Sequence, residues 1–285
     1  MQKRGHTMNI PIDQFASTFS EKVHNEDALY ADDTLWIVAD GASAIGPGDC
    51  MKTGSDAAWL SHALADAHEA FKDFTKPLEE LVRQQLIHLK ESFPNDGISP
   101  SAAIAIARLN EERGKLETFV LGDCVILIET ADGTLRISDD AVSHFDQTVI
   151  DRMVQISQSE GIPFLQTRQD ERIRSMLAQN RSKKNTPYGY SIIDLNANWP
   201  SSLQSEVDIK DVHAIALFSD GFDQLQEFMH LDNDAFMKMT LEDPSRAMDF
   251  LYFFQEKDAD CLQLPRLKKR DDTTLVCAEF LARSV

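Results

Sequence analysis

The stretch DTLWIVADGAS, residues 33–43, contains an apolar run that ends at the pair Asp40-Gly41. The run LWIVA is apolar at every position, which is typical of a strand that is covered on both faces. An Asp-Gly pair directly after such a strand has two interpretations. It forms a turn, because glycine supplies a positive φ and aspartate caps its own backbone, or it holds the Asp40 carboxylate in place for chemistry.

Four Asp-Gly pairs occur in the chain, and their surroundings separate them into two kinds. Asp132-Gly133 lies between two alternating patterns, VILIET and TLRIS, which predicts a tight hairpin turn. Asp96-Gly97 lies in SFPNDGISPS, which is typical of a loop. Asp40-Gly41 and Asp220-Gly221 each end a strand that is apolar on both faces, and neither is followed by a matching strand pattern. By spacing alone, a shared site at these two carboxylates and two unrelated turns both stay open.

Strand-like and helical patterns follow each other irregularly along the chain. Further strand-like runs are SAAIAIARL, LETFVLG, VILIET, TLRIS, YSIIDL, HAIALFS and TTLVCAEFL. Apolar spacing predicts helices over 55–71, 78–89, about 145–160, 170–181, 232–240 and 244–257, and FDQLQEF begins another. Regular alternation of strand and helix, which indicates a parallel sheet, does not occur. We therefore expect an α+β fold with largely antiparallel sheets covered by helices, in one domain over residues 1–285.

The charge of the chain restricts its partners. It has 285 residues, with 28 Lys and Arg against 47 Asp and Glu, so its formal net charge is −19. This charge argues against a nucleic-acid backbone or an anionic membrane as a partner. It is compatible with a site that concentrates carboxylates to hold cations, and equally with an ordinary acidic surface.

The cysteines and the apolar runs indicate a cellular compartment. No apolar run approaches membrane-spanning length, and the first residues contain no signal-like stretch. We therefore expect a cytoplasmic protein. The cysteines form no C-x-x-C pair, which argues against a zinc or redox motif; they are Cys50, Cys124, Cys261 and Cys277.

Other acidic residues lie at the edges of apolar patterns, as Asp40 and Asp220 do. FVLGDCVIL contains Asp123, and KKRDDTTLVCAEF contains Asp271 and Asp272 before the last strand-like run. NEDAL contains Glu26 and Asp27. Carboxylate oxygens are hard ligands that suit Mg²⁺ or Mn²⁺. The eight histidines are scattered, so no histidine and cysteine cluster competes as the metal site.

These motifs occur in a recognisable order: NED, a strand ending in DG, then GD, SDG, and DD before a last strand. The order resembles that of the PP2C-like, metal-dependent serine/threonine protein phosphatases, and the resemblance extends over about residues 20–280. It implies a four-layer αββα sandwich, with two mainly antiparallel sheets face to face and helices outside. It also implies hydrolysis of phosphoserine and phosphothreonine in protein substrates, with the ions in a cleft at one edge of the sheets.

The resemblance implies a metal-binding role for five residues. Asp40 is expected to bridge two Mn²⁺ or Mg²⁺ ions, and the carbonyl of Gly41 to be a ligand. Asp220 and Asp271 are expected to bind one of these ions, and Asp123 to help bind a possible third. A hydroxide that bridges the two ions is then the expected nucleophile.

Three further residues complete the expected site. Glu26 and Asp27 are expected to hold water molecules on the ions. Lys22 stands where members of the family usually carry an arginine that grips phosphate. A lysine presents a point charge instead of a bidentate fork, so its grip on phosphate is expected to be looser.

The loop after Asp40 also departs from the family pattern. The family motif D-G-x-G-G is DGASA here, and Ala42 replaces the histidine that some members use as a general acid. The proton for the leaving group is then expected from water on the metal or from His24, for which an ordinary loop position is the other interpretation.

A basic segment, 168–184, carries six basic residues against two acidic ones in a chain of net negative charge. It falls where the family has a variable flap beside the active site. Two interpretations stay open for it: an ordinary exposed helix face, or a set of substrate ligands that includes Arg172, Arg174 or Arg181.

Two alternatives to an active phosphatase follow from the same residues. Lys22 and the DGASA loop are compatible with a PP2C-like regulatory or binding protein whose catalytic activity is weak or lost. A structural cation-binding protein is the other alternative, but the D-x-D-x-D-G pattern of a calcium loop does not occur.

Overall fold

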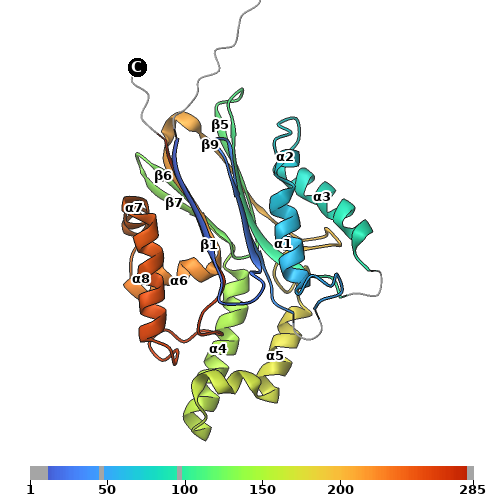
Figure 1. Ribbon diagram of the computed structural model, residues 1–285, viewed down its shortest axis with the longest axis vertical. Coiled ribbons are helices and arrows are strands. Elements are labelled where there is room, and N and C mark those ends of the chain that lie inside the picture. Colours follow the sequence, from blue (N-terminus) through green and yellow to red (C-terminus); the bar gives the residue numbers. More distant parts are fainter. Residues whose placement is uncertain (1–11, 45–47, 95–97, 281–285) are drawn as a thin grey trace, which may run out of the picture.

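Two antiparallel sheets face each other in the computed structural model, which describes residues 12–44, 48–94 and 98–280 (Figure 1). Within these ranges one sheet has the strand order β1-β11-β10-β6-β7, and the other has the order β2-β3-β4-β5-β9 with β8 beside β4. The strands are β1 (Ile12–Phe19), β2 (Asp27–Ala31), β3 (Leu35–Gly41), β4 (Ser101–Asn110), β5 (Lys115–Leu121), β6 (Val125–Thr130), β7 (Gly133–Ile137), β8 (Ile193–Asp194), β9 (Leu203–Asp208), β10 (Val212–Phe218) and β11 (Thr273–Phe280).

Helices cover the outer face of each sheet, so the layers run helix, sheet, sheet, helix (Figure 1). The second sheet is covered by α1 (Asp56–Asp66), α2 (His68–Phe71) and α3 (Leu78–Ser92), and the first by α6 (Asp220–Met229), α7 (Asn233–Glu242) and α8 (Pro244–Lys257). The expected αββα sandwich of antiparallel sheets is confirmed. Among the described residues, no helix has the length and apolar character needed to cross a membrane.

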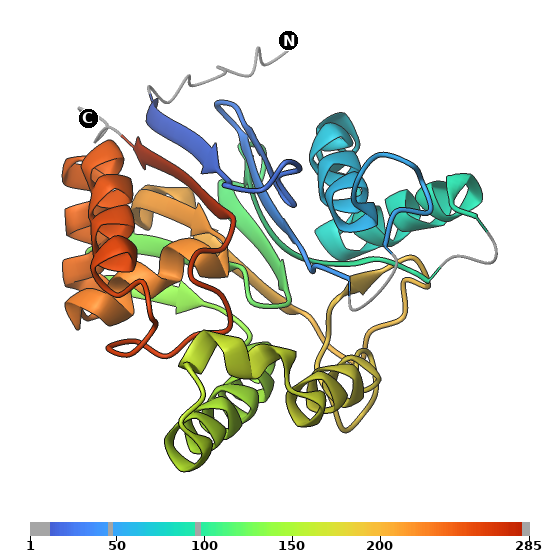
Figure 2. The ribbon, with the colours of Figure 1, turned by 60° about the horizontal axis from the view of Figure 1, so that its bottom comes forward.

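One further group of helices lies outside the sandwich. It consists of α4 (Ala141–Glu160), the 3₁₀ helix η1 (Phe164–Gln169) and α5 (Glu171–Arg181), and it is called the flap below. Figure 2 shows the flap beyond one end of the two sheets. A second 3₁₀ helix, η2 (Ile209–Asp211), leads into β10.

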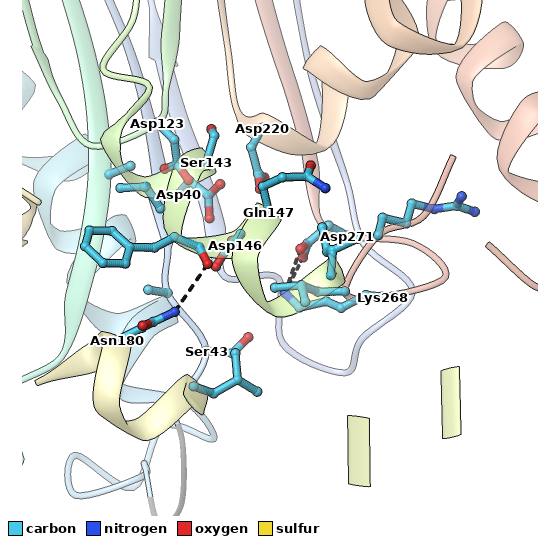
Figure 3. Close-up of a pocket in the computed structure, with 18 of the residues that line it drawn as sticks. Asp40, Ser43, Asp123, Ser143, Asp146, Gln147, Asn180, Asp220, Lys268 and Asp271 are labelled. Atoms are coloured by element: carbon cyan, nitrogen blue, oxygen red, sulfur yellow. Dashed lines mark hydrogen bonds and ion pairs between the residues drawn. The ribbon is translucent and has the colours of Figure 1, made fainter. Parts of the chain in front are cut away.

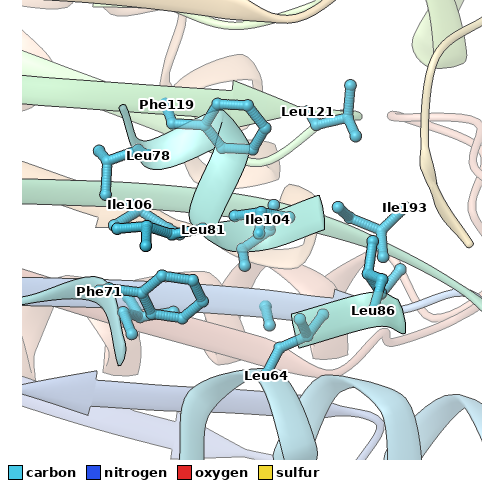
Figure 4. Packing of buried hydrophobic residues seen from close by; sticks show 14 of the residues in the cluster. Leu64, Phe71, Leu78, Leu81, Leu86, Ile104, Ile106, Phe119, Leu121 and Ile193 are labelled. Atoms are coloured by element: carbon cyan, nitrogen blue, oxygen red, sulfur yellow. The ribbon is translucent and has the colours of Figure 1, made fainter. Parts of the chain in front are cut away.

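The apolar run of β3 contributes to two separate cores. Trp36 and Val38 point between the two sheets, whereas Leu35 and Ile37 point toward α1–α3. Figure 4 shows the core under α1–α3, in which side chains of α3 pack against β4 and β5. Successive strand residues face opposite sides, so a strand buried on both faces must be apolar throughout. The doubly covered strand predicted from LWIVA is confirmed.

Most expected elements are present, and three differences stand out. The single helix expected over 55–71 is interrupted at Ala67, so that α1 and α2 are separate. The strand expected in YSIIDL is reduced to Ile193–Asp194. The strands β1, β2 and β9 were not expected, and β1 and β9 carry many polar side chains because they lie at sheet edges.

The structure separates the Asp-Gly pair of a hairpin turn from the two Asp-Gly pairs at strand ends. Asp132-Gly133 forms the hairpin between β6 and β7, and Gly133 has a φ of +120°. Asp96-Gly97 lies outside the described residues. A Cβ at Gly41 would lie 2.6 Å from the backbone oxygen of Glu26 and 2.8 Å from that of Ala57. At Gly221 an added Cβ would meet the backbone oxygen of Asp272. These last two glycines therefore permit close backbone approach.

Substitution of Gly41 by alanine should destabilise the protein by about 1–3 kcal/mol, because the new Cβ overlaps the backbone of Glu26, directly before β2, and of Ala57 in α1. Urea unfolding in the presence of EDTA measures this loss without any contribution from ions. Gly114→Asn is the control, because a Cβ at Gly114 meets nothing within 4 Å and asparagine tolerates its φ of +64°. Equal losses for the two variants would contradict the close-approach explanation.

Candidate metal centre

The strand register brings two of the predicted acids together. Asp40, near the end of β3, lies opposite Asp27 at the start of β2. The amide of Gly41 donates to the backbone oxygen of Glu26 at 2.9 Å, which extends this ladder by one more bond. Because the backbone carries both side chains, Asp40 and Asp27 cannot move apart without breaking the sheet edge.

The other predicted metal ligands reach the same end of the sandwich from the opposite sheet and from a turn. Asp220 is the first residue of α6, directly after β10, and Asp271 stands two residues before β11. Asp123 lies in the turn between β5 and β6. Together with Asp40 and Gly41, these residues line one cavity of about 300 Å³. Figure 3 shows the four carboxylates around this cavity, which is called the acidic pocket below.

A serine hydroxyl joins the two sheets behind the acidic pocket. The hydroxyl of Ser219, at the end of β10, donates to Oδ2 of Asp27 at 2.7 Å and accepts from the amide of Thr274 at 3.0 Å. The other carboxylate oxygen of Asp27, Oδ1, is buried and has no hydrogen-bond partner among the described residues. A buried acceptor without a donor is costly, so this oxygen suits a water molecule or a cation.

Burial, and after it mutual repulsion, raises the pKa values of the carboxyls in the acidic pocket. Burial raises the pKa of the Asp40 carboxyl well above its usual value, and the charges of Asp27 and Asp123 raise it further. Burial also raises the pKa of Asp220, with Asp40 as its strongest charged neighbour. Burial, followed by the charge of Asp146, raises the pKa of Asp123 to about 7. A cation among these carboxylates would relieve the repulsion.

The donor set fits a hard divalent cation. The side chains that line the pocket offer carboxylate oxygens, and these are the ligands that Mg²⁺ and Mn²⁺ prefer. Within residues 12–44, 48–94 and 98–280, no three His, Cys, Asp or Glu side chains converge closely enough to hold an ion as they stand. Ion binding therefore requires the carboxylates to draw together.

Lys22 and Glu26 form a hydrogen-bonded cluster beside the acidic pocket. The Lys22 ammonium donates to Oε2 of Glu26 at 2.6 Å and to Oδ2 of Asp272 at 2.8 Å. Hydroxyls of Ser43 and Ser55 also donate to Glu26. Although burial opposes it, these bonds lower the pKa of Glu26. Lys22 therefore pairs with carboxylates and lies outside the lining of the acidic pocket.

The flap contributes arginines to the pocket, but not all the expected ones. Arg181 and Arg168 line the acidic pocket, while Arg172 and Arg174 lie outside its lining. Arg172 is held by Glu160, at 2.7 Å, and by Asp170. Arg181 donates to the backbone oxygen of Ser43 at 3.1 Å, and Arg168 donates to that of Leu267 at 3.0 Å. The flap is thus bonded to the loops that carry Asp40 and Asp271.

Asp146 and Lys268 are among the charged residues of the pocket that the sequence analysis missed. Asp146, on α4, lies in the acidic pocket, and burial raises its pKa to about 6. Its surrounding sequence matches no motif, so no signal pointed to it. The ammonium of Lys268 lies 2.7 and 2.6 Å from the two carboxylate oxygens of Asp271. The segment KKRDD contained a signal for Lys268, namely a basic run directly before the predicted ligands.

Comparison of this chain with protein-family models and with curated protein sequences found no match. Solved structures do match it. The catalytic domain of the serine/threonine protein phosphatase PstP, in complex with two manganese ions, is 13% identical with a TM-score of 0.51, and the match covers 95% of this chain and 97% of that one.

Two further solved structures, also serine/threonine phosphatases, match over nearly the whole chain at low sequence identity. MsPP, a PPM Ser-Thr phosphatase from Mycobacterium smegmatis, is 15% identical with a TM-score of 0.51, over 96% of this chain and all of that one. The serine/threonine phosphatase Stp1 from Staphylococcus aureus is 12% identical with a TM-score of 0.51, over 98% and 99% of the two chains. The chain therefore has the fold of the PPM, or PP2C-like, serine/threonine phosphatases.

Proposed function

We propose that this chain hydrolyses phosphoserine and phosphothreonine in protein substrates, with Mn²⁺ or Mg²⁺ as its cofactor. The observation that carries the proposal is the position of four carboxylates, Asp40, Asp123, Asp220 and Asp271, around one cavity at the end of a phosphatase fold. The match to a phosphatase that holds two manganese ions supports the choice of cofactor. The reaction needs oxygen ligands for the ions and a cation for the phosphate, and the acidic pocket offers both kinds of group.

In this proposal the carboxylates hold the ions. Asp40 and the carbonyl of Gly41 would contact two ions, Asp220 and Asp271 would bind one of them, and Asp123 would help to bind a weaker third. When bound, the ions would make water nucleophilic at neutral pH and offset the charge of the phosphoryl oxygens.

The residues around the ligands keep them in position. Ser219 orients the Asp27 carboxylate and leaves Oδ1 available to a water molecule. Ser55, the N-cap of α1, donates to Oε1 of Glu26 at 2.7 Å and fixes the other carboxylate proposed to hold water. These supporting hydrogen bonds matter because a misplaced ligand lowers both the affinity for the ions and the rate of hydrolysis.

The substrate phosphate would be bound chiefly from the flap. Lys22 is engaged by Glu26 and Asp272, so its charge is largely offset. Arg181 lines the acidic pocket and uses one N–H on the backbone oxygen of Ser43. A guanidinium has five N–H donors, so Arg181 can hold the loop and a phosphate oxygen at once. Of the three candidates in the basic segment, Arg181 is the one that lines the acidic pocket, and Arg168 of the same segment lines it too.

A second candidate function is a regulatory or binding protein with weak or lost activity. Its supporting observation is the pairing of Lys22 with Glu26 and Asp272, which ties up the residue expected to grip phosphate. The experiments below separate the two candidates.

Mn²⁺-dependent hydrolysis of an aryl phosphate and of phosphoserine peptides should fall about 100-fold or more in Asp40→Asn, because the substitution removes a proposed ion ligand. Phosphate release in steady state measures the loss. Asp132→Asn is the matched control, since Asp132 belongs to the Asp-Gly pair of a hairpin turn and should leave the rate unchanged. Tight Mn²⁺ binding without hydrolysis of any phosphoester would instead favour the regulatory protein.

Arg181→Ala should raise KM for a phosphopeptide about tenfold, because a charge-assisted hydrogen bond to phosphate is lost. Arg174→Ala is the matched control, because Arg174 is exposed on the same helix and outside the pocket lining. A fall in kcat with KM unchanged would mean that Arg181 only positions the loop at Ser43. Steady-state kinetics on both variants and on Arg181→Lys separate these outcomes.

In EDTA, the unfolding temperature should fall as the pH rises from about 5 to 8. Asp123 has a pKa of about 7 in the folded chain and about 3.9 when unfolded. Its contribution to stability is complete below the unfolded value and is lost as the pH rises through 7. Asp123→Asn should reduce the fall by roughly 2–4 °C. Identical pH profiles for the two proteins in differential scanning calorimetry would contradict the raised pKa of Asp123.

A further inference from the structure

Lys268 places a positive charge inside the acidic pocket. Its ammonium lies within hydrogen-bond distance of both oxygens of Asp271, at 2.7 and 2.6 Å, and Asp220 is another of its neighbouring charges. The side chain is largely buried, with 26% of its surface exposed. Figure 3 shows the ammonium beside Asp271, on the side of the pocket where Asp220 also points. A buried ammonium needs such partners to offset its desolvation.

The loop that carries Lys268 is held in place by several side chains. Arg168 of the flap donates to the backbone oxygen of Leu267 at 3.0 Å, and Arg266 donates to that of Lys269 at 3.1 Å. Arg266 is itself buried and paired with Asp258 at 2.7 Å. The backbone on both sides of Lys268 is therefore held by hydrogen bonds, and the fold of the loop places the ammonium against Asp271.

We propose that the Lys268 ammonium is a resident cation that stands in for the divalent ion otherwise shared by Asp220 and Asp271. This inference rests on the proposed function, because it concerns the same ions. A divalent ion at these two carboxylates has to displace the ammonium from Asp271 or bind beside it. If the ion displaces the ammonium, its affinity is lowered by the cost of the broken ion pair. If it binds beside the ammonium, its affinity is lowered by repulsion between like charges. The chain should then bind one ion well and the next one weakly.

Lys269 provides a matched comparison on the same loop. It also carries a positive charge, but its ammonium lies 3.2 Å from Glu256 and it does not line the acidic pocket. Removing the charge of Lys269 changes the net charge of the protein as much as removing that of Lys268. A difference in ion affinity between the two variants therefore reports the effect of where the charge lies and not the effect of the net charge.

Calorimetric titration with Mn²⁺ tests the proposal on the full chain. Wild type and Lys269→Met should show one tight ion and a weak second one. In Lys268→Met the second ion should bind about tenfold more tightly or better, a typical size for coupling between two sites. Lys268→Arg keeps the charge and should bind ions as wild type does. Unchanged affinity in Lys268→Met, or a gain in Lys268→Arg equal to that in Lys268→Met, would overturn the proposal.

Thermal unfolding gives a second measurement. Lys268→Gln is measured beside Lys268→Met, so that the test still works if the methionine variant folds poorly. In EDTA either variant should unfold at a lower temperature than wild type, because Asp271 loses the counter-charge that lies 2.6 Å from it and keeps only that of Lys22, at 3.7 Å. Mn²⁺ should then raise the unfolding temperature more in the variant than in wild type. An equal rise would contradict the resident cation while leaving the proposed function standing. Absence of Mn²⁺ binding in wild type, in the Lys268 variants and in Asp40→Asn alike would overturn both.

Discussion

Buried carboxylates that strand backbone places around one cavity are the constraint on which the rest of this molecule depends. Asp40 is fixed in the ladder between β2 and β4, and Asp220 begins a helix directly after a central strand. Their repulsion can be relieved only by protons or by cations, because the strands themselves cannot separate. The unpartnered Oδ1 of Asp27 adds an unsatisfied acceptor at the same place. A pocket of this kind costs stability until a cation enters it.

The stability that offsets this cost comes from elsewhere in the fold. Three apolar layers, one between the sheets and one under each set of helices, bury most of the large side chains. Gly41, which lines the acidic pocket, and Gly221, which follows Asp220, let backbones approach each other closely. The pocket therefore lies at strand ends, outside these apolar layers. A repulsive site on a well-packed scaffold is the usual arrangement when function and stability oppose each other.

The parts of this arrangement that depend on local pattern were predictable from the sequence. Strands covered on both faces must be apolar throughout, so LWIVA and IALF identified two interior strands, β3 and β10, and the acids at their ends. Edge strands such as β1 and β9 carry polar residues and leave a weaker signal. The pocket positions of Asp146 and Lys268 depend on how the flap and a long loop pack against the sandwich. No periodicity within either segment encodes that packing.

Arg181 and Lys268 illustrate what tertiary packing adds. Arg172 and Arg181 occupy one basic helix and look alike in the sequence, yet one pairs with Glu160 and the other enters the pocket. Lys268 sits between two backbone oxygens that are both held by arginines, so its ammonium can leave Asp271 only by rotation of the side chain. The loop and the flap then stay where they are. Exchange of the lysine for an ion would change the charge of the pocket and draw carboxylate side chains toward the ion, while the backbone of the strands, the loop and the flap stays in place. The chain can then tune ion affinity through one side chain.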